Sequence, residues 1–506
     1  MSRNADNQRI AKNTLLLYFR MLFTMAVSLY TSRVVLNALG VEDFGIYNVV
    51  GGIVVMLSFL NGAMAGATQR FLNIELGRKD EKQLKKAFST SLIIHIGVSI
   101  VVLLLAETIG LWFLNTCMNI SENRMHAANW VYQYSVAAFI VSVISVPYNA
   151  TIIAHEKMSA FAYISILEVI LKLAIVFILI VAPFDKLILY AFLIFLVGVI
   201  IRVVYGIYCK RHFLECKLID WRPDKPLLKD MLSFSSWTIV GSLGYIFHTQ
   251  GIAIIMNLFF GATVNAAQGI ANQVNSVVKG FVSNFLQALN PQVVKTYAAN
   301  EMNAMHKLVL RGCQISFYLV AFFAIPLMLE APMILKIWLR EVPEYTIIFV
   351  RLVLLLSLCD SFTTLLGTAK GATGKIKIYQ MTLTAIGLFH LPFSALFFYL
   401  GYPPYYAMYV YLVIILILQL FRIFFVCNSI GLSKKLFFKQ VVLRCGFVLV
   451  ISMCLPLYIH YIGTQSLGNS FLVGISSMIS IAIMALLLGF AKDDRSKLLY
   501  KIFNKR

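Results

Sequence analysis

The sequence predicts an all-α polytopic membrane protein of about fourteen transmembrane helices, and three observations support this fold class. Its 506 residues are 60% hydrophobic and 13% charged, whereas an average soluble protein is about 25% charged. The apolar residues form long runs, and about 20 helical residues cross the hydrocarbon of a bilayer. Basic segments separate these runs at every second connection. Only a helix satisfies its own backbone hydrogen bonds within such a run, so a helical bundle is expected.

The hydrophobic runs define the predicted spans and their grouping. The spans lie at residues 14–38, 44–72, 87–113, 126–152, 158–182, 186–208, 231–259, 263–292, 308–330, 345–368, 376–400, 404–427, 438–461 and 470–490. We expect two six-helix lobes in a parallel pseudo-repeat, followed by two further helices. The predicted divisions are an N-lobe at 1–208, a cytoplasmic linker at 209–230, a C-lobe at 231–427, and two extra helices with a basic cytoplasmic tail at 428–506.

The basic residues predict the orientation of the chain. Lys and Arg crowd the segments at 78–86, 210–229 and 492–506, whereas the intervening loops are nearly bare of them. Cytoplasmic loops of membrane proteins concentrate Lys and Arg, so both termini are predicted to be cytoplasmic. This placement also accounts for the formal net charge of +21 without nucleic-acid binding, which we do not expect.

A shift of 221 residues superimposes Gly40 on Gly261 (each before a long helix) and Lys86 on Lys307. Six helices separate the two halves, so both enter the membrane in the same direction. This is the parallel repeat of alternating-access transporters.

A stripe of polar residues runs along the helix at 263–292. Its members are Asn265, Gln268, Asn272, Asn275, Lys279, Ser283, Gln287 and Asn290. Spacings of three and four keep them on about a third of the helix circumference. Helix–helix packing through amides is one interpretation. We favour a hydrated cavity, because eight polar positions including a lysine exceed what one tight contact satisfies.

Basic residues within the spans each need a physical reason, because a central Lys or Arg costs about 2.5–3.5 kcal/mol. They include Arg20, Arg33, Arg70, Lys172, Arg202, Lys279 and Arg351. Lys172 follows Glu168 by four residues and is predicted to pair with it. Asp360, on the same helix as Arg351, is a candidate partner for that arginine. Arg70 and Arg202 lie near cytoplasmic ends, where long side chains reach the interface.

Arg20 and Lys279 have no such explanation. Arg20 shares a face with Thr24, Ser28 and Thr31, and Lys279 has no acid within a turn of its own helix. Cations in a wet cavity suit an anionic headgroup such as a pyrophosphate. Arg33 lies toward the outer end of the first helix. Two roles for it, in a release station or in a gate, are left open.

Two segments then resemble a known family. The stretch TSRVVLNALGVEDFGIYNVV at 31–50 and ATQRF at 67–71 are similar to the polysaccharide-flippase branch of the multidrug/oligosaccharidyl-lipid/polysaccharide exporter superfamily. The resemblance implies a non-enzymatic flippase of the bacterial inner membrane, which moves undecaprenyl-pyrophosphate-linked O-antigen or capsule repeat units outward. It also implies that Arg20, Arg33, Arg70 and Lys279 line a central cavity. Asn272 and Gln287 of the polar stripe complete the predicted substrate-binding set. A polysaccharide polymerase and chain-length proteins are further candidate partners.

Rival functions remain open at this point. A lipid II flippase and a cation-coupled drug exporter belong to the same superfamily, although the first two spans lack the acid that such exporters use. A membrane glycosyltransferase or polymerase is a weaker alternative, because the chain has no large external loop. A structural scaffold leaves the polar stripes unexplained. Eight cysteines without a C-x-x-C pair and scattered histidines predict no cofactor and no metal. His248 is interpreted as a cavity-wall residue or a proton-linked gate.

Overall fold

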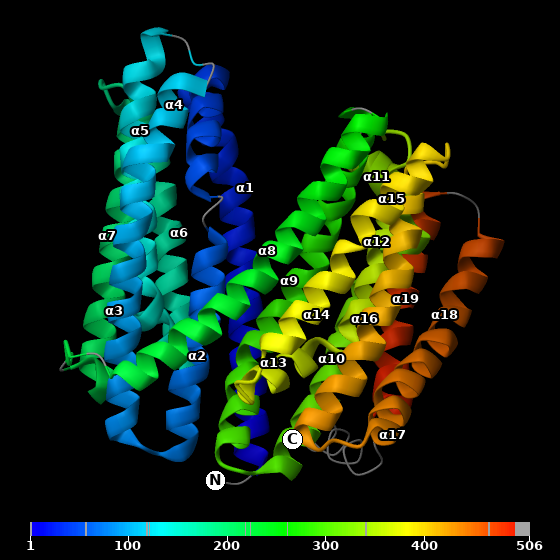
Figure 1. The fold of residues 1–506 in the computed structure, drawn as a ribbon. Helices are drawn as coiled ribbons and strands as arrows, with labels where there is room; N and C mark the ends of the chain where they lie inside the picture. The colour runs from blue at the N-terminus through cyan, green and yellow to red at the C-terminus, as the bar shows by residue number, and fades with distance from the viewer. Residues whose placement is uncertain are drawn as a thin grey trace, which may run out of the picture. The chain divides into compact units, whose positions relative to one another are not determined.

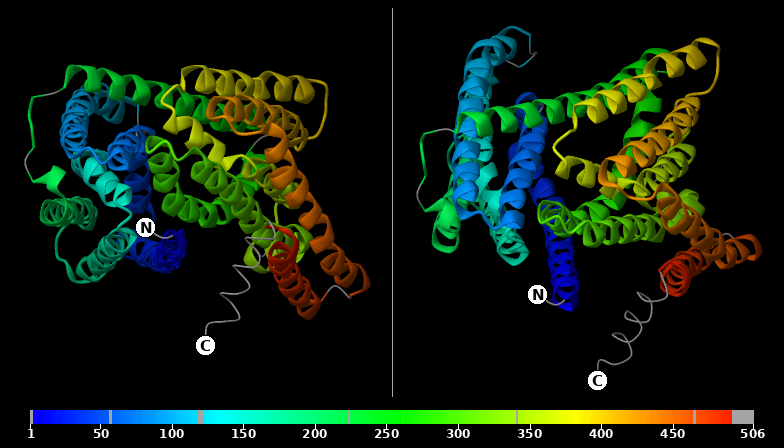
Figure 2. Two further views of the ribbon diagram at one scale, coloured as in Figure 1. Left: turned by 90° about the horizontal axis from the view of Figure 1, so that it is seen from below. Right: turned by 60° about the horizontal axis from the view of Figure 1, so that its bottom comes forward.

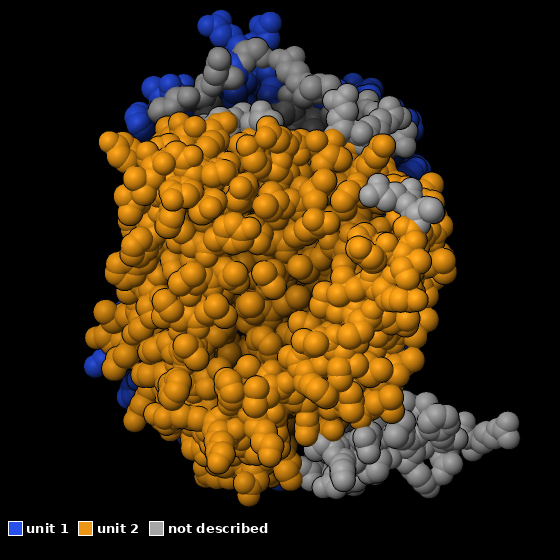
Figure 3. Space-filling view, turned by 90° about the vertical axis from the view of Figure 1, so that its right-hand side faces the viewer, with its two compact units in different colours: residues 1–239 blue, residues 240–506 orange. Residues whose placement is uncertain are grey.

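The regular structure of the protein is helical throughout the part described by this computed structural model. The described residues are 3–55, 58–117, 120, 122–217, 219–222, 224–260, 262–339, 342–463 and 466–490. They divide into two compact units, residues 1–239 (unit 1) and 240–506 (unit 2), which Figure 3 colours blue and orange.

Unit 1 contains the helices from α1 to α7 (Figure 1). Its elements are α1 (Arg3–Val55), α2 (Ser58–Arg78), α3 (Glu81–Leu105), the π-helical turn η1 (Ala106–Gly110), α4 (Leu111–Cys117), α5 (Glu122–Ala154), α6 (Met158–Val181), α7 (Lys186–His212) and the 3₁₀ turn η2 (Leu214–Cys216). Helix α5 packs along α7, α2 and α3, while α1 packs along α6. Helix α8 (Lys225–Phe260) begins in unit 1 and ends in unit 2.

Gly40 divides α1 into two helical segments that match the first predicted span and the start of the second. Its dihedral angles (φ 81°, ψ 170°) are not helical, and an L residue with a side chain rarely adopts them. Its counterpart under the 221-residue shift, Gly261, lies outside the described residues.

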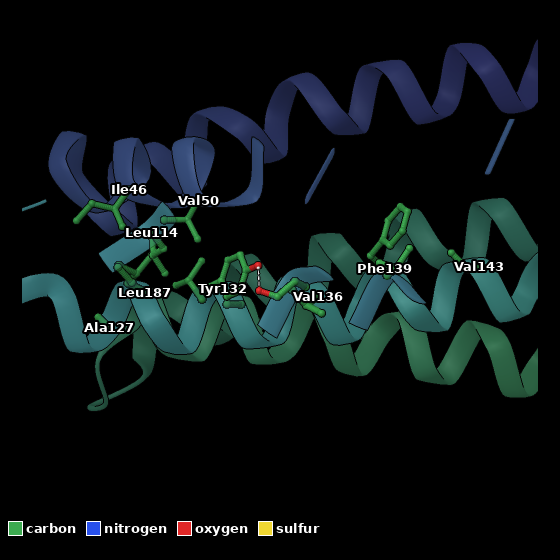
Figure 4. Packing of buried hydrophobic residues seen from close by; sticks show 14 residues of the cluster. Ile46, Val50, Leu114, Ala127, Tyr132, Val136, Phe139, Val143 and Leu187 are labelled. Carbon is green, nitrogen blue, oxygen red and sulfur yellow. Dashed lines mark hydrogen bonds between the residues drawn. The ribbon is translucent and has the colours of Figure 1, made fainter. Parts of the chain in front are cut away.

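A buried apolar cluster holds unit 1 together near α5 (Figure 4). Val50 of α1, Leu114 of α4 and Leu187 of α7 meet Val131 and Tyr132 of α5, and all five are almost fully buried. Packing between helices in lipid depends on such close van der Waals contact, because lipid tails are as apolar as the side chains.

Unit 2 contains the remaining helices. They are α9 (Ala262–Ala298), α10 (Met302–Leu329), α11 (Ala331–Leu339), α12 (Thr346–Ser361), α13 (Thr364–Ala372), α14 (Lys377–Leu388), α15 (His390–Tyr399), α16 (Tyr406–Ile430), α17 (Lys434–Phe437), the π-helical turn η3 (Phe438–Leu443), α18 (Arg444–Ile462) and α19 (Leu467–Leu488). Helix α9 packs on α10, α12 and α13, and α16 packs on α12 and α13. Helices α18 and α19, orange to red in Figure 2, lie side by side, and α19 packs on α10.

The predicted all-α polytopic membrane fold is confirmed. Within the described residues, 10 helical segments are long and apolar enough to cross a membrane, and they match ten of the predicted spans. The other predicted spans, 14–38, 44–72, 231–259 and 263–292, are helical over their described residues. They are the helices on which the sequence shows polar residues along one face.

Candidate functional site

Arg20 of α1 is held against an aromatic ring of α6. Its guanidinium carbon lies 4.6 Å from the centre of the Phe161 ring, and the side chain is half-buried. The hydroxyls of Thr24 and Thr31 on the same face donate to carbonyls of α1 itself, at 2.9 and 2.7 Å, so they add no cross-helix contact through these bonds. A cation over a desolvated ring is stabilised by about 2 kcal/mol. This stabilisation helps to offset the cost of a charged side chain within an apolar helix.

Arg70 of α2 rests on a different aromatic surface. Its guanidinium carbon lies 4.8 Å from the centre of Phe71 and 4.7 Å from the centre of Phe234, which belongs to the first half of α8. The two rings pack edge to face at 6.2 Å. Arg70 therefore links α2 to α8 within unit 1. Arg33 lies within α1, but its side chain is outside the described part of the structure.

Two further cations of unit 1 have structural partners. Lys172 donates a 2.6 Å hydrogen bond to Glu168, as the spacing predicts. Arg202 lies over the ring of Tyr148 at 3.8 Å. These contacts account for both charges without a ligand.

The residues of the polar stripe of α9 have different surroundings. Asn275 accepts a 2.5 Å hydrogen bond from Ser357 of α12, and Asn290 accepts one of 2.9 Å from Thr368 of α13. Asn272 and Ser283 are exposed, and Gln287 is half-buried. Helix packing therefore explains Asn275 and Asn290, and it leaves Asn272, Ser283 and Gln287 available for another role.

Lys279 lies in the middle of this stripe and faces an acid from another helix. Its Nζ is 3.7 Å from Oδ2 of Asp360, near the end of α12. Arg422 of α16 donates a 2.8 Å hydrogen bond from Nη1 to Oδ1 of the same carboxylate. Three helices thus bring two cations and one acid together inside unit 2.

Two more side chains of unit 2 complete the cluster around Asp360. Gln419, one turn before Arg422 on α16, donates from Nε2 to Oδ1 at 3.4 Å. Thr363, just after α12, donates to the side-chain oxygen of Gln419. We call Lys279, Thr363, Asp360, Gln419 and Arg422 the Asp360 cluster. A lone acid among apolar helices is costly, and the two cations and the amide around Asp360 offset this cost.

The expected pairing of Arg351 with Asp360 is wrong. Arg351 Nε instead donates to the backbone carbonyl of Met328 in α10, at 3.0 Å. Arg351 precedes Asp360 by more than two turns on α12, so its side chain meets the end of α10 rather than the acid.

Sequence reasoning missed Arg422 and Gln419 as site residues. They were visible as two polar residues within the apolar run at 411–425, and a spacing of three puts them on one helix face. That signal marks a polar face, but it does not identify Asp360 as the partner.

One end of unit 1 carries a second charged group, outside the apolar core. Arg124, at the start of α5, donates from Nε to Asp43 at 2.8 Å and from Nη1 to Asp185 at 2.7 Å. Burial by itself raises the pKa of Asp185, but the hydrogen bonds from Arg124 and from the backbone of Ile188 bring the pKa below its ordinary value. This group ties α1, α5 and α7 together.

The histidine His248 of α8 is buried against aromatic neighbours. Its ring centre is 4.6 Å from that of His390 and 4.6 Å from that of Tyr411. His390 in turn hydrogen-bonds the carbonyl of Ala407 at 2.9 Å. Within the described residues, no three metal-binding side chains gather into a site.

Comparison with known proteins decides the family. The sequence pattern of the family described as "Polysaccharide biosynthesis protein" matches residues 10–297, more than half of the chain. The chain belongs to this family. The matched region includes Arg20, Arg33, Arg70, Asn272, Lys279 and Gln287. It ends before Asp360, so Lys279 is the one residue of the Asp360 cluster that the matched region contains.

A relative and several solved structures agree with this family. The uncharacterized membrane protein EpsK of Bacillus subtilis is 20% identical over 324 residues, 63% of each chain, so the match spans less than two thirds of that relative's length. A MATE in complex with MaD3S has the same fold, with a TM-score of 0.72 and 13% identity over 84% of this chain and 97% of the other. A MOP superfamily transporter from Pyrococcus furiosus has a TM-score of 0.64 and 13% identity over 98% of this chain and 97% of the other. The chain is therefore a multi-pass membrane protein of this polysaccharide-biosynthesis family, and it shares the fold of these transporters.

Proposed function

We propose that this family member is a flippase for undecaprenyl-pyrophosphate-linked oligosaccharide repeat units, such as O-antigen units. It moves them from the cytoplasmic to the outer leaflet of the inner membrane by alternating access of an N-lobe at 1–208 and a C-lobe at 231–427. The family match supports a polysaccharide precursor as cargo, and the half-buried cations within apolar helices support an anionic headgroup.

The observation that carries the proposal is the half-exposed ammonium of Lys279 in a polar stripe. Its side chain is 44% exposed, and its nearest described acid lies at 3.7 Å, beyond ordinary hydrogen-bond length. A lysine so placed within a predicted span is suited to meet a phosphate oxygen. Arg20, Arg33 and Arg70 are the corresponding candidates in the N-lobe, while Asn272 and Gln287 are candidates to hydrogen-bond the sugar.

A deletion of the gene tests the class of cargo. Loss of this protein should cause a lipid-linked oligosaccharide to accumulate with its sugar on the cytoplasmic face, measured by lipid extraction and mass spectrometry. If surface polysaccharide is normal and the deletion strain instead becomes sensitive to cationic drugs, the drug exporter is the better assignment. Accumulation of lipid II identifies the lipid II flippase.

The orientation has its own test. Both termini are proposed to be cytoplasmic, on the basis of the alternation of basic loops. A reporter active only in the cytoplasm should be active when fused to either end. A periplasmic signal from either fusion contradicts the orientation. A polysaccharide polymerase and chain-length proteins are the partners that we would seek by cross-linking.

A further inference from the structure

The two oxygens of Asp360 have different partners. Oδ1 receives hydrogen bonds from Arg422 at 2.8 Å and from Gln419 at 3.4 Å. Oδ2 faces Lys279 at 3.7 Å, too far for a direct hydrogen bond. One cation of the Asp360 cluster is therefore bonded to the acid, and the other only stands close to it.

The cation that is hydrogen-bonded to Asp360 is also the less exposed of the two. The side chain of Arg422 is 23% exposed, that of Asp360 is 36% exposed, and that of Lys279 is 44% exposed. Arg422 also donates a 3.4 Å hydrogen bond to Thr363, which fixes its guanidinium in a second direction. Lys279 is thus the member that can leave Asp360 with the smallest loss of contacts.

We propose that Asp360 is a built-in counter-ion that holds Lys279 until the diphosphate of a lipid-linked sugar takes its place. This inference rests on the proposed function and adds its exchange step. Lys279 moves from Oδ2 of Asp360 to a phosphate oxygen when cargo binds, and it returns to Asp360 when cargo leaves. Arg422 is a positioning residue, because it acts on the cargo only through Asp360.

This exchange explains why two cations surround one acid. If Lys279 were the sole partner, its departure would leave a carboxylate uncompensated among apolar helices, which is strongly unfavourable. Arg422 keeps Asp360 neutralised throughout, so Lys279 is able to move. The return of Lys279 to Asp360 competes with the diphosphate, and this competition favours release of the cargo.

Binding of a simple polyprenyl diphosphate tests the exchange on the purified full-length protein. The probe is farnesyl diphosphate, with farnesol and inorganic pyrophosphate as separate arms. Asp360→Asn removes the competing anion and should tighten binding of farnesyl diphosphate about fivefold, the size of a modest exposed ion pair. Lys279→Gln should reduce the preference for farnesyl diphosphate over farnesol, because one of the cations proposed to meet the phosphate is lost.

Arg422 provides the decisive comparison. Arg422→Gln leaves Asp360 with Lys279 as its cationic partner, so binding should weaken about fivefold or more. The double variant Asp360→Asn/Arg422→Gln should return to the wild-type affinity or exceed it, whereas a purely structural loss at Arg422 would not be rescued. Arg422→Lys, which keeps the charge, is the matched control and should bind nearly as the wild type does. Thermal unfolding in detergent verifies that each variant is folded.

The outcomes separate the inference from the proposed function. If the wild type binds farnesyl diphosphate and Asp360→Asn binds no more tightly, the counter-ion role is wrong while the cargo class stands. If the wild type shows no preference for farnesyl diphosphate over farnesol, the diphosphate cargo and the exchange are both wrong. If inorganic pyrophosphate binds as tightly as farnesyl diphosphate, the site recognises the free anion and not a lipid. This result also overturns the inference.

Discussion

The hydroxyl of Tyr132 in α5 donates a 2.8 Å hydrogen bond to the carbonyl of Ala106, where α3 turns into η1. The backbone N–H of Leu111 donates to the same carbonyl, and Gly110 at the end of the π-helical turn leaves room for the tyrosine. A Cβ at Gly110 would lie 2.0 Å from that hydroxyl. The lack of a side chain at Gly110 and the bond from Tyr132 thus depend on each other.

Gly110→Ala should therefore destabilise unit 1, because the new methyl group overlaps a buried, hydrogen-bonded tyrosine. The expected loss is about 1–3 kcal/mol, as for overpacked sites in general, and it is measured as a lower unfolding temperature in detergent. Gly97→Ala in α3 is the matched control, since a Cβ there meets nothing within 4 Å. Gly110→Ala/Tyr132→Phe should recover part of the loss, and an unfolding temperature equal to that of the wild type in the single variant would contradict the steric account.

The sequence predicted the fold because the bilayer imposes it locally. Each helix satisfies its own backbone, so span length and hydropathy are readable without tertiary information. Lys172 and Glu168 were paired correctly for the same reason, as they are four residues apart on one helix.

The Asp360 cluster shows where sequence reasoning ends. Lys279 stood out because a cation in a span is costly. Its partner could not be read from the sequence, because 81 residues separate Lys279 from Asp360 and 62 separate Asp360 from Arg422. Asp360 was paired with Arg351 because the two have opposite charges on one helix. In the structure Arg351 contacts the end of α10 instead, and Asp360 contacts Lys279 and Arg422.

The group around Arg124 predicts a component of acid sensitivity. The hydrogen-bonded Asp185 has a folded-state pKa below its ordinary value of 3.8. A lowered pKa stabilises the folded state above the unfolded-state pKa, and this contribution is lost as the pH falls through the lower folded-state value. The unfolding temperature of the wild type should therefore decline below about pH 4 more steeply than that of Asp185→Asn. Parallel curves for the two proteins would contradict the prediction.

The packed and the exposed residues of the α9 stripe predict different reactivity toward a water-soluble thiol reagent. In a background that lacks the exposed Cys454, a cysteine in place of Asn272 or Gln287 should label readily, because these positions are exposed or half-exposed. A cysteine in place of Asn275 should resist labelling, since this position faces Ser357 of α12. Equal labelling at 272 and 275 would mean that position 275 is not packed against α12. Failure at 272 and 287 together would remove the case for water along this helix.

The stacking of Arg20 on Phe161 predicts that shape and charge are both required at this position. Arg20→Ala should reduce translocation of lipid-linked oligosaccharide at least about tenfold, because a charge contact made during transport is lost, while the amount of protein in the membrane stays unchanged. Arg20→Lys keeps the charge but loses the planar face over Phe161, so an intermediate rate is expected, and Phe161→Leu should resemble it.

The control for Arg20 is the ion pair between Lys172 and Glu168 of α6. Lys172 and Glu168 neutralise each other at 2.6 Å, so Lys172→Met/Glu168→Leu removes a cation from a span without removing net charge. This double variant should transport as the wild type does, since half-exposed pairs of this kind contribute little. If it fails as Arg20→Ala does, any disturbance of charge within unit 1 blocks transport, and Arg20 has no particular role in meeting the cargo. If both Arg20→Ala and the control transport normally, Arg20 has no role in the mechanism. Its contact with Phe161 is then a purely structural one.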